Sequence, residues 1–335
     1  MKHVTAAGVI AIGASAGGVD ALQRLIGALP EDLPAAVCVV LHIPASSRSL
    51  LARIIARQTA LPVEAATHGA PLRPGHVYVA PPDHHLRVAP CELALDRGPK
   101  ENGVRPAVDP LFRSVAEHYG QRGMAVVLSG ALSDGAAGAG AVAAAGGAVL
   151  VQRLEDAIVP SMPESTLATV PGARSDVAQA LAGELSRWAA ELPPPEPKQT
   201  SVASHETPIV PNAARGLPDG PPVPVTCPEC HGPLWELGKA DLVHYRCRVG
   251  HVYAADALLL GKGEAIESAL WVALEALEER RELLAKVAER LSAAGRHRSA
   301  AQMREAARSA GERAELIRGA LAIDGDDAAL QAEAS

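Results

Sequence analysis

Aromatic residues are scarce in this sequence, which has three Trp, four Tyr and one Phe among 335 residues. This scarcity excludes a core built on large rings, so Ala, Val and Leu must supply most of the apolar volume. Long hydrophobic runs are also missing: no stretch of about 18 apolar residues occurs, which excludes a membrane-spanning helix. Basic residues are not in excess either. The formal net charge of −7 and the pI near 6.0 argue against nucleic-acid binding.

Cysteine is scarce as well, and the odd number of five does not suit a disulfide framework. Three of the five fall within 21 residues that begin at Cys227. This clustering predicts a metal site in a reducing compartment, and we therefore expect a cytoplasmic protein. The apolar stretch at residues 6–14 contains Gly8 and Gly13, so we interpret it as a buried strand entering a glycine turn and not as a signal peptide.

Short apolar runs alternate with helical patterns over residues 8–188. Continuous aliphatic runs of this kind are typical of parallel strands that helices cover on both faces. The clearest runs are Val9–Ile12, Val37–Leu41, Ala125–Leu128 and Ala148–Val151. The alternation predicts an α/β fold with a doubly wound, mostly parallel, Rossmann-like sheet. Residues 75–96 instead predict a hairpin inserted in that pattern.

The composition changes after this domain. Proline and small polar residues dominate residues 192–224, which predicts a linker. Farther on, leucines recur every seven residues from Leu270 to Leu291, and a second helical pattern follows Gly295, so we predict an antiparallel helical hairpin with a coiled-coil seam. The predicted organisation is an α/β domain at 1–190, a Pro-rich linker at 191–225, a zinc-ribbon-like module at 226–255, the hairpin at 262–322 and a disordered tail at 323–335.

The first predicted strand runs directly into Gly13-Ala14-Ser15-Ala16-Gly17-Gly18. A G-x-S-x-G turn between a strand and a helix can expose a nucleophilic serine, and the amide after it can face a developing oxyanion. A glycine-rich turn after a first strand is equally typical of dinucleotide-binding folds. On its own the motif leaves both interpretations open.

Two other strand ends favour the nucleophile. His42 follows the second predicted strand, and Asp134 lies just beyond the strand that ends at Leu128. Active sites of open α/β sheets form at the carboxyl ends of the strands. A serine nucleophile needs a histidine base, and the base needs a carboxylate to orient it. The three residue types therefore predict a Ser15–His42–Asp134 catalytic triad.

Five blocks of the sequence resemble, in order, those of the CheB family of chemotaxis protein-glutamate methylesterases. The blocks are GASAGG at 13–18, LHIP at 41–44, VYVAPPDHHL at 77–86, RPAVDPLF at 105–112 and LSGALSDGAAG at 128–138. The resemblance implies a hydrolase that cleaves glutamyl methyl esters on chemoreceptors, releases methanol and needs no cofactor. It implies Ser15 as nucleophile, His42 as base and acid, and Asp134 as the orienting carboxylate. It also implies the backbone amides of Ala16 and Ala131 as oxyanion donors, although the family usually has Met where this chain has Ala131.

Other polar residues near these motifs have simpler interpretations. Histidines elsewhere in the domain, at positions 68, 76, 84, 85 and 118, lie in loop, hairpin or helix contexts, so we prefer His42 as the base. Asp109 is expected to cap the helix that starts at Pro110. Ser129 and Ser133 are expected to make local backbone bonds around the Asp134 turn.

The cysteine cluster predicts a structural zinc site. Cys227 and Cys230 form a C-x2-C pair, and Cys247 and His251 follow after sixteen residues. Three thiolates and one imidazole at this spacing suit a closed, tetrahedral zinc ion. His244 could replace His251, and His231 is a weaker candidate.

The sequence supports three functional hypotheses. The first is a methylesterase acting on chemoreceptors, which could also deamidate glutamine because the acyl-enzyme is the same. The second is a signalling adaptor that keeps the fold and only binds, and the third is a nucleotide-binding regulator that uses the glycine turn. Well-known members of the family carry an N-terminal receiver domain, whereas this sequence starts with the catalytic motifs, so we expect no phosphorylation control within the chain. The C-terminal helices are expected to contact a protein partner or a second copy.

Overall fold

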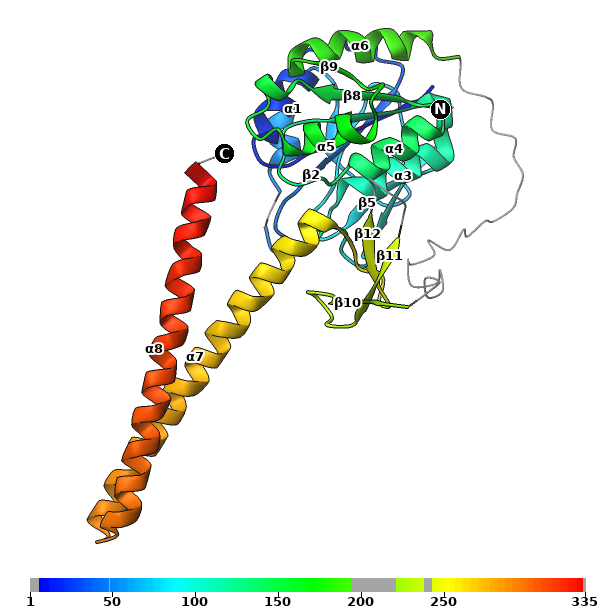
Figure 1. Cartoon of the computed structure of the whole chain (residues 1–335). Coiled ribbons are helices and arrows are strands. Elements are labelled where there is room, and N and C mark those ends of the chain that lie inside the picture. The colour runs from blue at the N-terminus through cyan, green and yellow to red at the C-terminus, as the bar shows by residue number, and fades with distance from the viewer. Residues whose placement is uncertain (1–5, 48, 194–220, 238–242, 334–335) are drawn as a thin grey trace. The chain divides into compact units, whose positions relative to one another are not determined.

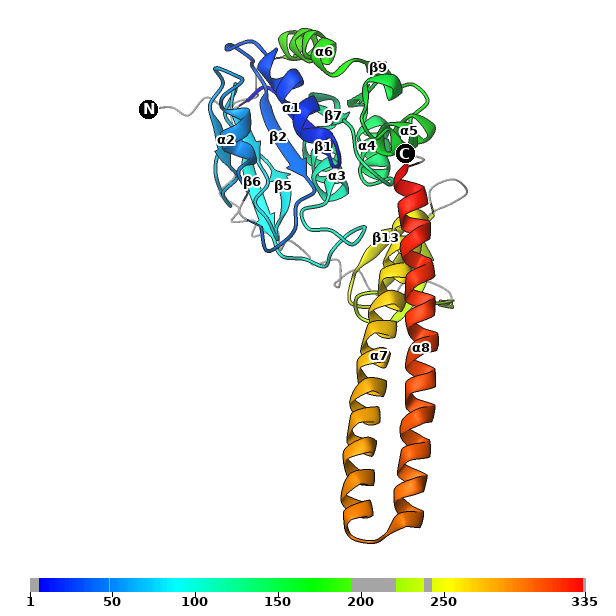
Figure 2. The same ribbon diagram turned by 90° about the vertical axis from the view of Figure 1, so that its left-hand side faces the viewer.

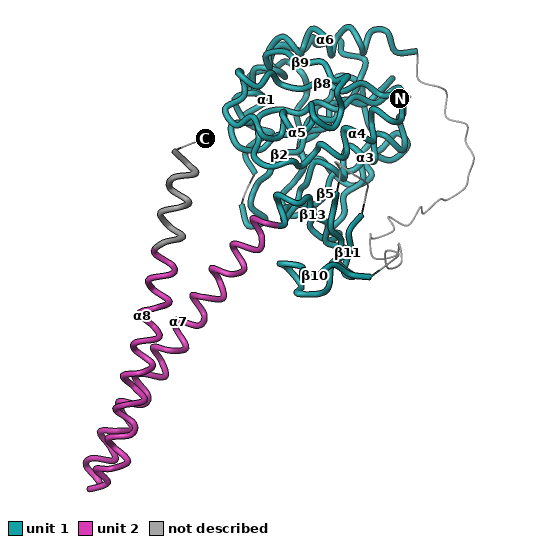
Figure 3. The backbone as a smooth tube through the Cα atoms, viewed as in Figure 1, with its two compact units in different colours: residues 1–258 teal, residues 259–335 magenta. Residues whose placement is uncertain are grey.

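The computed structural model describes residues 6–47, 49–193, 221–237 and 243–333. Most of the predicted linker at 191–225 lies outside these ranges. The chain divides into two compact units, residues 1–258 and residues 259–335 (Figure 3). The first unit contains both the α/β domain and the cysteine cluster, and the second contains most of the two C-terminal helices.

A seven-stranded sheet forms the centre of the first unit (Figure 1). In spatial order its strands are β3 (Val63–Ala65), β4 (Val77–Val79), β2 (Ala36–Leu41), β1 (Val9–Ala14), β7 (Gly123–Val127), β8 (Ala148–Gln152) and β9 (Arg174–Asp176). Every pairing between neighbours is parallel. The predicted doubly wound α/β fold is thus confirmed, with β1 at the centre and successive strands added on both sides of it.

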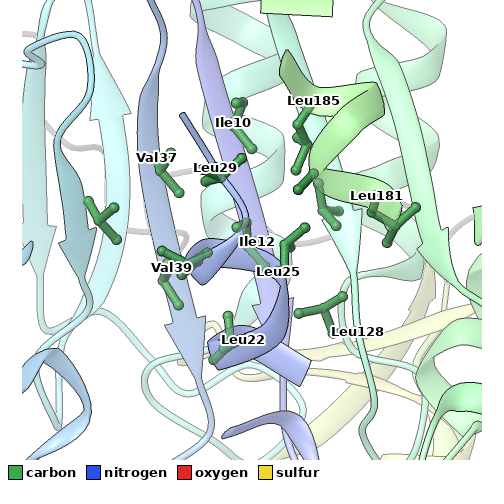
Figure 4. Packing of buried hydrophobic residues seen from close by; sticks show 14 of the residues in the cluster. Ile10, Ile12, Leu22, Leu25, Leu29, Val37, Val39, Leu128, Leu181 and Leu185 are labelled. Atoms are coloured by element: carbon green, nitrogen blue, oxygen red, sulfur yellow. The ribbon is translucent and has the colours of Figure 1, made fainter. Parts of the chain in front are cut away.

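Helices cover both faces of this sheet. One face packs against α1 (Gly18–Gly27), α2 (Leu51–Ile55) and α6 (Ala178–Glu191). The buried side chains on this face are aliphatic except for Met124, and Trp188 is an aromatic residue packed against them from a half-buried position (Figure 4). The other face packs against α3 (Val108–Tyr119), α4 (Ala136–Ala144) and α5 (Ser161–Thr169). Except for Leu128, which follows β7, the four predicted apolar runs lie within strands, and except for Ala148 their residues are buried because both faces are covered.

The inserted hairpin is shorter than predicted. Only β5 (His85–Ala89) and β6 (Glu92–Asp96) pair antiparallel, in a two-stranded sheet of their own. The residues from Val77 to Val79, which we expected in the hairpin, form β4 and pair parallel with β2. Three apolar residues are too few to show whether a strand joins a hairpin or a parallel sheet.

A second, four-stranded antiparallel sheet contains the cysteine cluster. Its strands are β10 (Val223–Thr226), β11 (Pro233–Leu237), β12 (His244–Cys247) and β13 (Val252–Ala254). We call residues 223–258, which add the first residues of the next helix to this sheet, the cysteine module. Its small apolar core combines cysteine side chains with Leu234, Tyr253 and Leu258.

The second unit consists of two long helices. α7 (Ala255–Ala293) starts at the end of the cysteine module, and α8 (His297–Glu333) runs back beside it; Figure 2 shows the two side by side, as Figure 1 does from another direction. The predicted end of the hairpin at residue 322 lies inside α8. In both helices the seam positions are the buried or half-buried ones, with Leu274, Ala288, Ala310 and Ala314 among the most buried. Among the described residues, no helix has an apolar stretch sufficient to cross a membrane.

Candidate active site

Three neighbouring strands bring the predicted triad together. Ser15 directly follows β1, His42 directly follows β2, and Asp134 lies in the loop between β7 and α4. The strands are adjacent in the order β2-β1-β7 and run parallel, so their carboxyl ends meet at one edge of the sheet. Residues far apart in the sequence therefore share one site.

Glycines let the turn after β1 fit closely against its neighbours. Gly17 has a φ of 73°, a left-handed conformation that suits glycine, and a Cβ there would lie 2.6 Å from Cβ of Ile158. A Cβ on Gly18 would lie 2.6 Å from Cβ of Ala14. The amide of Ser15 donates to the carbonyl of Ser129 at 2.9 Å, which fixes the turn against the loop after β7.

The His42 ring lies between the other two side chains. Its Nδ1 is 3.1 Å from Ser15 Oγ, and its Nε2 is 2.7 Å from Asp134 Oδ2. An ionised carboxylate only accepts hydrogen bonds, so Nε2 carries the proton and Nδ1 presents its lone pair to the serine hydroxyl. In this tautomer His42 can accept the hydroxyl proton while Asp134 stabilises the charge that results.

Asp134 is almost fully buried and is held by several donors. Oδ2 also accepts the amide of Val108 at 2.6 Å, while Oδ1 accepts the amide of Asp109 at 3.2 Å and the side-chain amide of Asn102 at 3.1 Å. Burial opposes ionisation of this carboxyl, but hydrogen bonds and charge from His42, together with the two backbone amides, outweigh burial and lower its pKa. Asn102 was missed by sequence reasoning, since a single polar loop residue leaves no periodic signal.

Asp109 has a different role from the one predicted. It lies within α3, is buried, and its Oδ1 accepts the amides of Gly135 at 3.1 Å and Gly138 at 2.7 Å. It therefore caps the start of α4 and not its own helix. Burial, reinforced by the charge of Asp134, raises the pKa of Asp109 to about 7.

The amides of Ala16 and Ala131 donate to no acceptor among the described residues. Ala131 follows Gly130, where an added Cβ would lie 2.9 Å from Cβ of Ser15 and 2.1 Å from Sδ of Met162. The loop after β7 thus passes directly beside the serine. An amide pair that is left free next to a nucleophile can bind an oxyanion.

The serines of that loop do not make the local bonds we predicted. Ser129 Oγ donates to the carbonyl of Ala16 at 2.7 Å and accepts the amide of Val159 at 2.9 Å. Ser133 Oγ donates to Asp256 Oδ1 at 2.9 Å, in the cysteine module. Gln152, at the end of β8, accepts the amide of Ser129 at 2.8 Å. These bonds connect separate loops, so they hold the turn that contains Ala16 in place.

Two of the other histidines that we considered as bases, His68 and His85, have hydrogen-bond partners away from Ser15. His85 is buried, and it connects the carbonyl of Pro99 at 3.0 Å with the amide of Ala107 at 3.3 Å. Burial lowers its pKa. His68 accepts the backbone amide of Leu95. His85 is therefore a structural residue that supports the segment leading to α3.

The four predicted metal ligands lie together at one end of the cysteine module. The ligand atoms of Cys227, Cys230, Cys247 and His251 are all within 4.8 Å of one another. Sγ of Cys230 and Cys247 are 3.6 Å apart, and Nδ1 of His251 is 3.6 Å and 3.4 Å from Sγ of Cys227 and Cys247. Two thiolates at about 2.3 Å from a tetrahedral zinc ion would be roughly 3.8 Å apart, so the cluster has the size that such an ion requires.

Comparisons with known proteins agree with this architecture. The family model described as CheB methylesterase matches residues 10–184. A protein-glutamate methylesterase/protein-glutamine glutaminase of Methanosarcina barkeri is 40% identical over 167 residues, which cover 48% of this chain and 46% of that protein. One from Rhodospirillum rubrum is 42% identical over 164 residues, covering 47% of this chain and 42% of that protein.

This chain thus spans about half the length of the curated relatives it matches. The crystal structure of the Thermotoga maritima CheB methylesterase catalytic domain is 34% identical, with a TM-score of 0.52, and the match covers 54% of this chain and 97% of that one. Because the family model matches more than half of this chain, the chain belongs to the CheB methylesterase family.

Proposed function

We propose that this protein hydrolyses glutamyl methyl esters on chemoreceptor-type proteins. The observation that carries the proposal is the geometry of Ser15, His42 and Asp134, in which Nδ1 of the imidazole is 3.1 Å from the serine oxygen and Nε2 is 2.7 Å from the carboxylate. The names of the relatives supply the substrate class. No cofactor is required, because these side chains provide the nucleophile, the base and its orienting group.

In the first half of the reaction, Ser15 Oγ attacks the ester carbonyl and passes its proton to Nδ1 of His42. The oxyanion that forms is stabilised by the amides of Ala16 and Ala131. Collapse of the tetrahedral intermediate breaks the bond to the methoxy oxygen, and the imidazolium protonates it, so methanol leaves. The glutamyl group remains as an ester on Ser15.

In the second half, water takes the place of methanol. His42 accepts a proton from the water as it attacks the acyl-enzyme, and then returns that proton to Ser15 Oγ. Free glutamate is the product. A glutamine substrate would form the same acyl-enzyme and release ammonia, and the glutaminase part of the relatives' names supports this second activity.

The test measures methanol release from methylated chemoreceptor cytoplasmic fragments by the full chain. Ser15→Ala is expected to abolish release, whereas Ser47→Ala should keep it, because among the described residues the Ser47 hydroxyl bonds only to the carbonyl of Pro44. Ammonia release from fragments with unmodified glutamine tests deamidation. If the wild-type chain releases neither product, the adaptor hypothesis replaces the enzyme.

We further propose that Cys227, Cys230, Cys247 and His251 bind one structural zinc ion. The support is a compact cluster with a Cys3His donor set inside a module whose apolar core is small. All four positions of a tetrahedral ion would be filled, so the metal would stabilise the fold and take no part in ester hydrolysis. The cluster, with the free cysteines, also supports a reducing, cytoplasmic setting for the reaction.

The C-terminal helices are proposed to contact a protein partner or a second copy of the chain. Large apolar side chains such as Trp271 and Leu316 are exposed on the hairpin, which supports such an interaction. Sedimentation equilibrium of the full chain and of a chain ending at residue 258 would distinguish the two cases.

A further inference from the structure

The cysteine module contacts the loops that build the triad, within the first compact unit. β13 lies beside residues 100–104: the amide of Asn102 donates to the carbonyl of Val252 at 2.7 Å, and Glu101 and Val252 form a parallel bridge. Lys100 pairs with Glu229, which lies between the first two cysteines. The module thus adds a short stretch of strand pairing to a segment of the α/β domain.

Asn102 connects this pairing to the active site through its side chain. Its Oδ1 accepts the amide of Ala254 in β13 at 2.8 Å, and its Nδ2 donates to Oδ1 of Asp134 at 3.1 Å. The residue is only 8% exposed, and its φ of 52° is a left-handed conformation that asparagine tolerates. Because the amide group is planar, fixing its oxygen on the module also fixes its nitrogen toward the carboxylate.

A second set of contacts holds the loop that contains Ala131 and Asp134. Leu132, between them, packs against the apolar core of the module. Ser133 donates to Asp256 at 2.9 Å. The module therefore contacts the active-site loop at two consecutive positions, in addition to the contact through Asn102.

We propose that the cysteine module is a positioning part of the catalytic site, and that Asn102 is the positioning residue through which it orients Asp134. The inference rests on the proposed esterase function, and it assigns a role to a segment that lies outside residues 10–184, where the family model matches. With the module folded around its metal, the carboxylate is held in line with His42. When the module is unfolded, Asp134 keeps the backbone amides of Val108 and Asp109 but loses a fixed side-chain donor.

Two single substitutions break this connection from opposite sides. Asn102→Gly removes both side-chain bonds and keeps the left-handed backbone accessible. Ala254→Pro removes the amide that Asn102 Oδ1 accepts, at the end of β13, and alters no residue of the α/β domain. Ala255→Pro is its matched control, because the first position of a helix tolerates proline. Bound zinc, measured for each purified chain, identifies variants whose module is folded.

We expect Asn102→Gly to lower kcat for methanol release about tenfold, with KM unchanged, because loss of a hydrogen-bond partner that orients a metal-binding side chain costs about 10- to 100-fold in comparable sites, and Asp134 would keep its two backbone donors. Ala254→Pro should lower kcat in the same direction, and Ala255→Pro should not. The double variant that combines Asn102→Gly with Ala254→Pro should have a kcat no lower than that of Asn102→Gly alone, because both changes remove the same connection. Chelation of the metal from the wild-type chain should lower kcat, and adding zinc back should restore it.

The rate at which a fluorophosphonate labels Ser15 provides a second readout that needs no receptor. If the wild type is labelled but releases no methanol, the proposed substrate is wrong and the positioning inference is judged on labelling rates alone. If Asn102→Gly and Ala254→Pro, both with full zinc, match the wild type in kcat and labelling, the inference is overturned. Absence of labelling in the wild type also overturns it, because there would be no reactive serine to support. Fully additive losses in the double variant would show separate effects and exclude Asn102 as the connection.

Discussion

At the residue scale, each oxygen of the Asp134 carboxylate accepts two hydrogen bonds, Oδ2 from His42 and Val108 and Oδ1 from Asp109 and Asn102. Asp134→Asn keeps the shape but replaces one acceptor by an NH2 group. The NH2 group would face hydrogen-bond donors that now bond to the carboxylate, and His42 would shift toward the tautomer with its proton on Nδ1. We expect kcat to fall about 10⁴-fold, as is typical of a triad with the wrong tautomer. Methanol release measures this loss, and an Asn variant with a tenth of the wild-type kcat would contradict it.

Asp109 allows a prediction of how stability depends on pH. The native carboxyl, with a pKa of about 7, keeps its proton over a range in which the unfolded one, near 3.9, has lost it. Ionisation then favours the unfolded state, so wild-type stability should fall between pH about 4 and about 7 relative to Asp109→Asn, whose amide oxygen can still accept the bonds from Gly135 and Gly138. The difference in free energy of unfolding between Asp109→Asn and the wild type should grow by roughly 1 to 4 kcal/mol over this pH range and stay constant above it. Urea unfolding at several pH values measures it, and a difference independent of pH would show that Asp109 is ionised throughout.

At the scale of elements, the turn after β1 and the loop after β7 approach so closely that glycine is required. Gly130→Ala would place a methyl group against Ser15 and Met162. We expect a loss of kcat of at least tenfold from displacement of the serine, which methanol release would reveal. The matched control is Gly183→Ala in α6, where a methyl group meets nothing within 4 Å; it should keep activity and raise stability by about 0.5 to 1 kcal/mol. Full activity in Gly130→Ala would show that the loop can move away without cost.

The seam of the helical hairpin gives a second prediction at this scale. Leu274 is 6% exposed, whereas Leu283, on the same helix, is 63% exposed. Leu274→Ala should therefore destabilise the hairpin by about 2 to 3 kcal/mol, and Leu283→Ala should change it by less than about 0.5 kcal/mol. Thermal unfolding of the two full-length variants and the wild type, followed by the helical circular dichroism signal, compares the two substitutions. Equal effects would mean that the two helices do not pack through this seam.

The sequence was most informative where a pattern extends over several residues. Four buried runs predicted the central strands, and the residues just after three of them are the ones the sheet brings together as Ser15, His42 and Asp134. Isolated polar contacts were not predictable. Asn102 and Asp109 act across distances of 26 to 152 residues in the sequence, and neither leaves a periodic signal. The same holds for the contacts between the cysteine module and the Asp134 loop, which depend on tertiary packing and not on local preference.

At the scale of the whole molecule, the cysteines differ in their surroundings. Cys38 is fully buried in β2, where burial raises its pKa, while Cys91 is partly exposed. With zinc bound, a thiol reagent should label Cys91 alone, because metal-bound thiolates and a buried thiol react slowly. After chelation, the three cysteines of the module should be labelled as well. Mass spectrometry of the labelled peptides tests this, and rapid labelling of Cys227 in the zinc-loaded chain would rule out the metal site.

The bond between Asn102 and Ala254 spans 152 residues of sequence. Because translation proceeds at about 5 to 20 residues per second, the ribosome would take roughly 8 to 30 s to add those residues after Asn102 has been made. Part of that time is spent making the rest of the α/β domain, which ends with α6 at Glu191, and roughly 3 to 13 s then pass before β13, the strand that holds Asn102, is complete. Under the proposed function and the proposed role of the cysteine module, a newly made chain would therefore pass through a period in which Ser15 is in place and the Asp134 carboxylate is incompletely oriented, and it would reach full esterase activity only after its cysteines had been made and had bound metal.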